Sequence, residues 1–199
     1  MKDLLKNAFW IAAALCLLLA VTLTASVRRQ SAELASRVVR LHVIAASDGA
    51  AEQAVKLEVR DAVLELLTPR LAGCESREEA ERTLAASLGE IEDAARGVCG
   101  CDVSVTLGRE RFPTRVYETF ALPAGEYESL RVTIGAGEGR NWWCVVFPPL
   151  CDPERSGEAF AALGDGAEAS LAGDGVVLKF RFVEWLEKLA GRISAAKTR

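Results

Sequence analysis

The sequence predicts an α+β domain with two consecutive helices packed on a mostly antiparallel sheet. Between residues 51 and 95, apolar side chains recur at helical spacing, whereas residues 103–147 alternate in short runs separated by Pro and Gly. An apolar segment at the N-terminus precedes this domain. Without that segment roughly 170 residues are left, enough to bury one substantial core.

Residues 1–29 are predicted to form a signal peptide or a transmembrane anchor. Lys2 and Lys6 precede an apolar run from Phe9 to Val27, which ends at a pair of arginines. The run is close to the roughly 20 residues that a bilayer span needs. No clear cleavage site follows it, and the arginine pair weakens an outward orientation of the chain. We still expect the following domain to be exported, either cleaved or anchored.

Composition narrows the class of protein. The net charge of −4 is small and the charges are interspersed, so no basic surface for nucleic acid is evident. Half of the residues are apolar, which excludes a disordered chain.

The first half of the domain is predicted to hold one strand and the two helices. Residues 37–46 alternate as a strand with Arg40 and His42 on the same face. Residues 51–67 follow as a helix that Pro69 should end or kink. Ser76 and Glu79 form a capping box, so a second helix should begin at Arg77 and lie antiparallel to the first. The expected apolar faces are Val55, Val59, Ala62 and Leu66 on the first helix, and Ala80, Leu84, Leu88, Ile91 and Ala95 on the second.

Strands dominate the second half. They are expected at 103–107, 127–134, 142–147 and 176–182, with a short helix at 184–189. The predicted organisation is a core domain at 37–151, a variable linker at 152–175, and a C-terminal strand and short helix at 176–192. Residues 135–139 alternate Gly with other residues, and a strand rather than a helix follows them. We therefore expect a hairpin turn there and not a phosphate loop.

The sequence shows no clear catalytic or metal motif. His42 is the single histidine, no nucleophile elbow is present, and a hydrogen-bonded strand histidine is the favoured interpretation. We expect no enzyme activity and no cofactor. A zinc site from Cys99, Cys101, Cys144 and Cys151 is disfavoured because the spacings match no standard pair. Calcium binding by Asp165 and Asp174 is a weak alternative to a plain linker.

The segment Asn141–Cys151 combines two adjacent tryptophans with two cysteines. On a strand, Trp142 and Trp143 point to opposite faces. The segment is then either a central strand buried on both sides, which is favoured, or a recognition strand with one aromatic face for another protein. Cys144 and Cys151 fit a short disulfide loop in an exported domain, but their Cα separation decides whether they are bridged.

Several segments resemble the stage II sporulation protein R family. They occur in the family's order and lie at Arg40–Ala45, Lys56–Val63, Phe112–Arg115, Leu122–Glu128, Ile134–Gly139 and Asn141–Cys151. The resemblance implies a protein made in the forespore and exported to the space between forespore and mother cell. There it would activate a membrane-embedded aspartic protease that processes the precursor of sigma-E.

An activator of this kind needs a binding surface and no nucleophile. The residues expected to provide that surface are Trp142, Trp143, Phe112, Pro113, Arg115, Glu126 and Tyr127. Two other classes are retained as alternatives. A secreted hydrolase acting on the cell envelope would need a clustered acid–base pair or a metal in a pocket. A structural envelope protein held by its N-terminal segment would need no specific partner.

Overall fold

The computed structural model describes residues 2–117, 120–150, 159–160, 163 and 171–197. The chain divides into two compact units. The sheet unit comprises residues 34–112 and 126–169, and the terminal unit comprises residues 1–33, 113–125 and 170–199.

The sheet unit is built on four strands: β1 (Val39–Ile44), β2 (Val103–Phe112), β5 (Gly125–Ile134) and β6 (Asn141–Phe147), in the order β2-β5-β1-β6. β1 is parallel to β5 and antiparallel to β6. The Gly135 amide donates to the Asp102 carbonyl at 2.8 Å, which places the end of β5 beside the start of β2. These two strands are therefore antiparallel. The α+β class is confirmed, with a mixed sheet.

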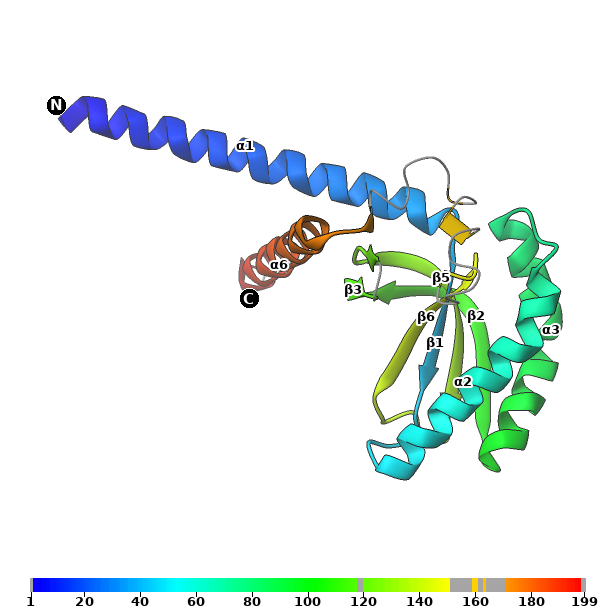
Figure 1. Ribbon diagram of the computed structural model, residues 1–199. Helices are drawn as coiled ribbons and strands as arrows, with labels where there is room; N and C mark the ends of the chain where they lie inside the picture. Colours follow the sequence, from blue (N-terminus) through cyan, green and yellow to red (C-terminus); the bar gives the residue numbers. More distant parts are fainter. Residues whose placement is uncertain (1, 118–119, 151–158, 161–162, 164–170, 198–199) are drawn as a thin grey trace. The chain divides into compact units, whose positions relative to one another are not determined.

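Helices α2 (Ala50–Leu71) and α3 (Arg77–Cys99) lie side by side against one face of this sheet (Figure 1). The core forms between the helices and that face. It contains Val39, Leu41 and Val43 of β1, Leu130, Val132 and Ile134 of β5, Cys144, Val146 and Phe147 of β6, and apolar residues of both helices. The predicted helix pair on a sheet is confirmed.

The buried face of α2 differs from the prediction. Val59, Val63 and Leu67 are fully buried, whereas Val55, Ala62 and Leu66 are only half-buried. The sequence offers apolar residues on two adjacent stripes of this helix, so spacing alone does not decide which one faces the sheet. α2 also continues through Pro69 to Leu71. The missing proline N–H leaves only the carbonyl of Glu65 without a helical donor, and Glu65 is exposed to water.

α3 begins where the capping box predicts. Ser76 Oγ accepts a hydrogen bond from the Glu79 amide at 3.3 Å. The Glu79 carboxylate in turn accepts from the amide of Glu75 at 2.9 Å, one residue earlier than in the standard box. The buried face holds Ala80, Leu84, Ser87, Ile91 and Ala95, with Leu88 half-buried beside it.

The glycine-rich segment 135–139 is not a hairpin turn, because β1 lies between the two strands that it connects. The segment instead crosses the end of β1. The amides of Glu138 and Gly139 donate to the carbonyls of Ala46 and Ala45 at 3.2 and 2.9 Å. A Cβ on Gly139 would lie 2.2 Å from the Ser47 carbonyl oxygen, so the crossing requires glycine at this position.

The terminal unit contains α1 (Lys2–Ala35), β3 (Arg115–Val116), β4 (Ala121–Leu122) and α6 (Asp174–Lys197). Among the described residues, α1 is the single helix long and apolar enough to cross a membrane, and its most apolar stretch is not buried. Ser31 Oγ donates to the Ala124 carbonyl at 3.0 Å, and Arg28 pairs with Glu187 of α6 at 2.8 Å. The C-terminal part of α1 thus bonds both to the segment that follows β4 and to α6.

The strand predicted at 176–182 is wrong, because α6 runs as one helix from Asp174 to Lys197. Its apolar residues form two faces. Phe180 and Val183 are buried, while Leu178, Phe182, Trp185 and Leu189 form an exposed stripe at helical spacing. Two apolar faces on one helix produce local alternation at 178–182, and this alternation imitates a strand. Most of the predicted linker, including Asp165, lies outside the described residues.

Candidate partner-binding face

The start of β6 is fixed by polar contacts from the loop after β1 and from α2. Asp48 Oδ1 accepts from the Arg140 amide at 2.7 Å. Lys56 Nζ donates to the Arg140 carbonyl at 3.1 Å and to Gln53 Oε1 at 2.7 Å. The Lys56 side chain is buried in α2's sheet-facing surface, and this burial lowers its pKa. These contacts fix the backbone of Arg140, which directly precedes Asn141, Trp142 and Trp143.

The pairing of β1 with β6 places the two tryptophans on opposite faces, as predicted. Val43 is paired with Trp142, and His42 with Trp143. Trp142 packs against the core cluster beneath the helices, where the Arg60 guanidinium lies 4.4 Å from the centre of its ring. β6 is, however, an edge strand of the described sheet, and both indoles are half-buried. The favoured interpretation is therefore wrong about the central position of the strand, whereas burial on both sides is confirmed for Cys144–Phe147.

Trp143 belongs to a polar and aromatic cluster on the sheet face away from α2 and α3, here called the His42 face. It comprises Arg40, His42, Glu110, Phe112, Tyr127, Asn141 and Trp143. The His42 imidazole stacks on the Trp143 ring, with centroids 3.7 Å apart and planes 15° apart. Phe112 meets Trp143 edge-on at 4.7 Å.

Both nitrogens of His42 are hydrogen-bonded to side chains. Nδ1 lies 2.8 Å from Glu110 Oε1, and Nε2 lies 2.8 Å from Asn141 Oδ1. Burial lowers the pKa of His42, and the bonds to Asn141 and Glu110 only partly offset it. Both partner atoms are oxygen acceptors, so the neutral ring can donate to only one of them at a time, and only the protonated ring donates to both. The prediction of a hydrogen-bonded strand histidine is confirmed.

Arg40 is the most deeply buried charge on this face, at 0% exposure. Its guanidinium carbon lies 4.3 Å from the centre of the Phe112 ring and 5.1 Å from that of Tyr127. Its Nε donates to the carbonyl of Cys144 on the neighbouring strand β6 at 3.0 Å. The cation is therefore enclosed by aromatic rings and bonded to the sheet backbone, which joins β1, β2, β5 and β6 on one face.

The structure separates the predicted surface residues by exposure. Phe112 and Tyr127 are buried, at 0% and 1%, so they support the cluster from within. Trp142 and Trp143 are half-buried and Glu126 is exposed. The remaining two predicted residues, Pro113 and Arg115, lie in the terminal unit and are half-buried.

Glu110 and Asn141 were not predicted as site residues. Alternation along β2 offered a signal for Glu110, because it stands two residues before Phe112 and so shares its face.

Only one of the two cysteines predicted to form a bridge lies in the described residues. Cys144 is buried in the core cluster, and Cys151 lies outside the described residues, so the Cys144–Cys151 bridge stays a prediction. Within the described part of the chain, no group of three or more His, Cys, Asp or Glu side chains is arranged to hold a metal ion.

Comparisons with known proteins identify the family. Residues 35–156 match the family model of stage II sporulation protein R. The chain is 34% identical over 189 residues to "Stage II sporulation protein R" of Bacillus subtilis (strain 168), covering 80% of this chain and 84% of that protein. The chain belongs to the stage II sporulation protein R family. No solved structure matches it.

Family membership confirms the resemblance and supports a role in sporulation. The segments that carry the resemblance meet on the His42 face. Arg40 and His42 come from the first of them, Phe112 and Tyr127 from two in the middle, and Trp143 from the last. Residues that are distant in the sequence thus build one cluster.

Replacing His42 with Gln should reduce the loss of stability in acid. Because the folded pKa of His42 lies below its ordinary value, the unfolded chain takes up the proton first as the pH falls through about 6.5. The parent therefore loses stability from that pH down to the folded pKa, and Gln does not titrate. Melting temperatures of both proteins between pH 5 and 8 would show this. A parent that becomes more stable in this window relative to the variant would contradict a neutral His42.

Proposed function

We propose that this protein is an exported sporulation signal that activates a membrane-embedded aspartic protease, which then processes the sigma-E precursor. The signal passes from the forespore to the mother cell through the space between their membranes. The observation that supports this proposal is an apolar helix, long enough to cross a membrane, directly before a domain of the stage II sporulation protein R family. Such an arrangement delivers the domain to the compartment that a membrane-embedded protease faces.

Trp143 is the best candidate for direct contact with the protease. It stands on an edge strand, partly buried, on a base made of His42 and Phe112. Asn141 and Arg131 are exposed on the adjacent positions of β6 and β5. An aromatic side chain held rigidly by its neighbours and rimmed by polar groups is the usual anchor of a protein interface.

The terminal unit provides a second link to the membrane. The ion pair between Arg28 and Glu187 joins α6 to the end of the apolar run in α1. The exposed stripe of α6, formed by Leu178, Phe182, Trp185 and Leu189, combines aromatic and aliphatic groups with flanking lysines and arginines. This composition suits a helix that lies in the membrane interface. A signal held at the membrane surface reaches a membrane-embedded protease by diffusion within the membrane plane.

The hydrolase alternative is less well supported. Its histidine would have to exchange a proton with substrate, but both ring nitrogens of His42 are engaged by Glu110 and Asn141. The structural-envelope alternative needs no aromatic anchor on an edge strand. A protein signal agrees with both the engaged His42 ring and the aromatic side chain on the edge strand, and it requires no catalytic group.

The decisive experiment is co-expression of the full chain with its cognate protease and the sigma-E precursor in a non-sporulating host, with processing followed on a gel. The parent should give processed sigma factor. A variant with Leu17→Arg and Leu18→Arg in α1 should give none, because two charges at mid-bilayer depth oppose insertion. No processing by an exported, folded parent would refute protease activation, and processing by the non-exported variant would refute the need for export.

A fusion experiment tests export alone. A reporter enzyme that is active only outside the cytoplasm, joined after Arg37, should be active because the segment Phe9–Val27 is long and uncharged. The same fusion carrying Leu17→Arg and Leu18→Arg should be inactive. If a cytoplasm-specific reporter alone is active at this position, the topology is reversed and the intercellular signal is excluded.

A further inference from the structure

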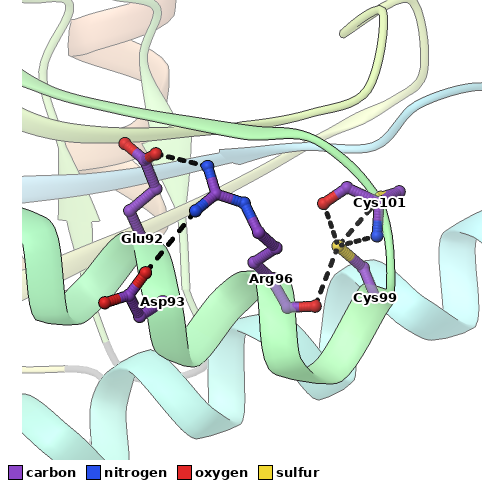
Figure 2. A network of polar contacts seen from close by, with 5 residues as sticks. All are labelled: Glu92, Asp93, Arg96, Cys99 and Cys101. Atoms are coloured by element: carbon purple, nitrogen blue, oxygen red, sulfur yellow. Dashed lines mark hydrogen bonds and ion pairs between the residues drawn. The ribbon is translucent and has the colours of Figure 1, made fainter.

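Two cysteines stand together where α3 ends, outside the His42 face. Cys99 is the last residue of α3, and Gly100 follows in the left-handed conformation at φ 62°. This turn brings Cys101 back toward Cys99, so that the two Sγ atoms lie 2.8 Å apart (Figure 2). Cys101 is exposed and Cys99 is half-buried, so both sulfur atoms are near the surface. A bond between them would require a separation of about 2.0 Å, which is a short further approach.

The hydrogen bonds give the two sulfur atoms different roles. Cys99 Sγ accepts from the Cys101 amide at 3.3 Å and from the Cys101 thiol at 2.8 Å. Cys99 Sγ also faces two acceptors, the Cys101 carbonyl oxygen at 3.4 Å and the Arg96 carbonyl oxygen at 4.0 Å, which offset these donors. The same hydrogen bond to Cys99, together with burial and nearby negative charge, raises the pKa of Cys101 to about 11. Cys99 is therefore the sulfur that attacks, and Cys101 is the sulfur that keeps its proton until the second step.

The surroundings make this pair a reducing rather than a strongly oxidising one. Arg96 lies three residues before Cys99, but Figure 2 shows its guanidinium turned toward Glu92 and Asp93, at 2.5 and 3.5 Å, and not toward the sulfur atoms. The end of a helix and Asp102 add negative potential. Strong disulfide oxidants owe their potential to a stabilised reduced form, and that stabilisation is weak here.

We propose that Cys99-Gly100-Cys101 is a thiol–disulfide exchange site that takes a disulfide as its substrate. The Cys99 thiolate attacks one sulfur of the substrate, which breaks the substrate's S–S bond and releases one thiolate. The Cys101 thiol then loses its proton to solvent and attacks Cys99 Sγ, which releases the second thiolate. The protein ends with a Cys99–Cys101 disulfide, having given up two electrons and two protons, and the substrate ends as two thiols.

The other thiols in the described part of the sheet unit do not compete for this reaction. Cys74 lies near the opposite end of α3, where its Sγ is 3.7 Å from Thr83 Oγ1, and the helix from Thr83 to Cys99 spans about 24 Å. Cys144 is buried in the core. The disulfide that the reaction leaves in the protein therefore joins Cys99 to Cys101.

The test uses the full chain in detergent, incubated with oxidised glutathione at pH 7.5 and then alkylated and analysed by peptide mass spectrometry. The peptide 97–109 should lose two hydrogens and carry no glutathione. Cys101→Ser should trap glutathione on Cys99, because the resolving sulfur is gone. Cys99→Ser should slow glutathione release at least about tenfold, whereas Cys74→Ser should behave as the parent. Circular dichroism melting checks that each variant is folded.

A parallel incubation with insulin, whose disulfides are accessible, identifies the source of the substrate. Exchange with glutathione alone supports a small-molecule disulfide, and exchange with insulin supports a protein disulfide. Full alkylation of both cysteines after both incubations overturns the proposal, as does independent glutathionylation without loss of hydrogen. Neither result depends on protease activation, so failure here leaves the proposed function unaffected.

Discussion

Replacing Trp143 with Ala is expected to abolish processing of the sigma-E precursor while leaving the domain folded. Trp143 is half-buried at the sheet edge and rests on His42 and Phe112, so its removal deletes a partly exposed ring and opens no enclosed cavity. Loss of those ring contacts should cost about 1–2 kcal/mol of stability. A central aromatic anchor is worth at least about 2 kcal/mol of binding, which is roughly a 30-fold loss of affinity.

Trp142 is the matched control, since it is the same residue type, one position away, on the other face. It packs against the core cluster and beneath Arg60. Trp142→Ala should therefore cost about 3 kcal/mol, the lower end for a large core aromatic because the ring keeps some exposure. Its remaining folded fraction should still activate the protease. The measurements are melting temperature and precursor processing for both variants beside the parent.

The outcome separates two accounts of β6. If both variants only unfold the domain, β6 is a structural strand, and the contact surface must be sought on Glu126 or on Pro113 and Arg115. If Trp142→Ala abolishes processing at full stability, the helix-side face is the contact surface. Phe replacements at both positions, which keep an aromatic ring, should give weaker forms of each effect.

Local patterns predicted most of the sheet unit because each depends on few neighbours. The Ser76–Glu79 spacing marks the start of α3, since capping involves only one turn of chain. Alternation around His42 places Arg40 and His42 together, and alternation around Trp142 and Trp143 separates the two rings. The faces of strands are therefore accessible from sequence.

Long-range pairing was not accessible in the same way. The glycine segment 135–139 was expected to be a hairpin because two strand patterns flank it, and sequence does not reveal that β1 enters between them. With β1 between β5 and β6, β6 is the last strand of the described sheet and therefore an edge strand. In α6, two apolar faces with different burial imitate alternation at 178–182. Glu110 and Asn141 reach His42 across 68 and 99 residues, which no local pattern encodes.

Replacing Arg40 with Ala is expected to destabilise the sheet unit by about 3–5 kcal/mol. The side chain is fully buried, so truncation leaves a cavity between Phe112 and Tyr127 and removes the donor to the Cys144 carbonyl. Burial of a charge costs free energy on its own, but here the aromatic rings and the carbonyl compensate it. Loss of the whole side chain removes both the compensation and the packing.

Arg40→Met separates packing from charge. Methionine fills the space of the arginine stem and can contact Phe112 and Tyr127, but it has no positive charge and no donor for the Cys144 carbonyl. We expect it to cost about 1–3 kcal/mol, clearly less than Ala. Urea unfolding followed by circular dichroism, with equal m-values, gives both free energies. If Arg40→Met is as stable as the parent, the guanidinium contributes only volume. If Arg40→Ala loses less than about 1 kcal/mol, the aromatic enclosure does not support the sheet, and the base beneath Trp143 must be held by His42 and Glu110 instead.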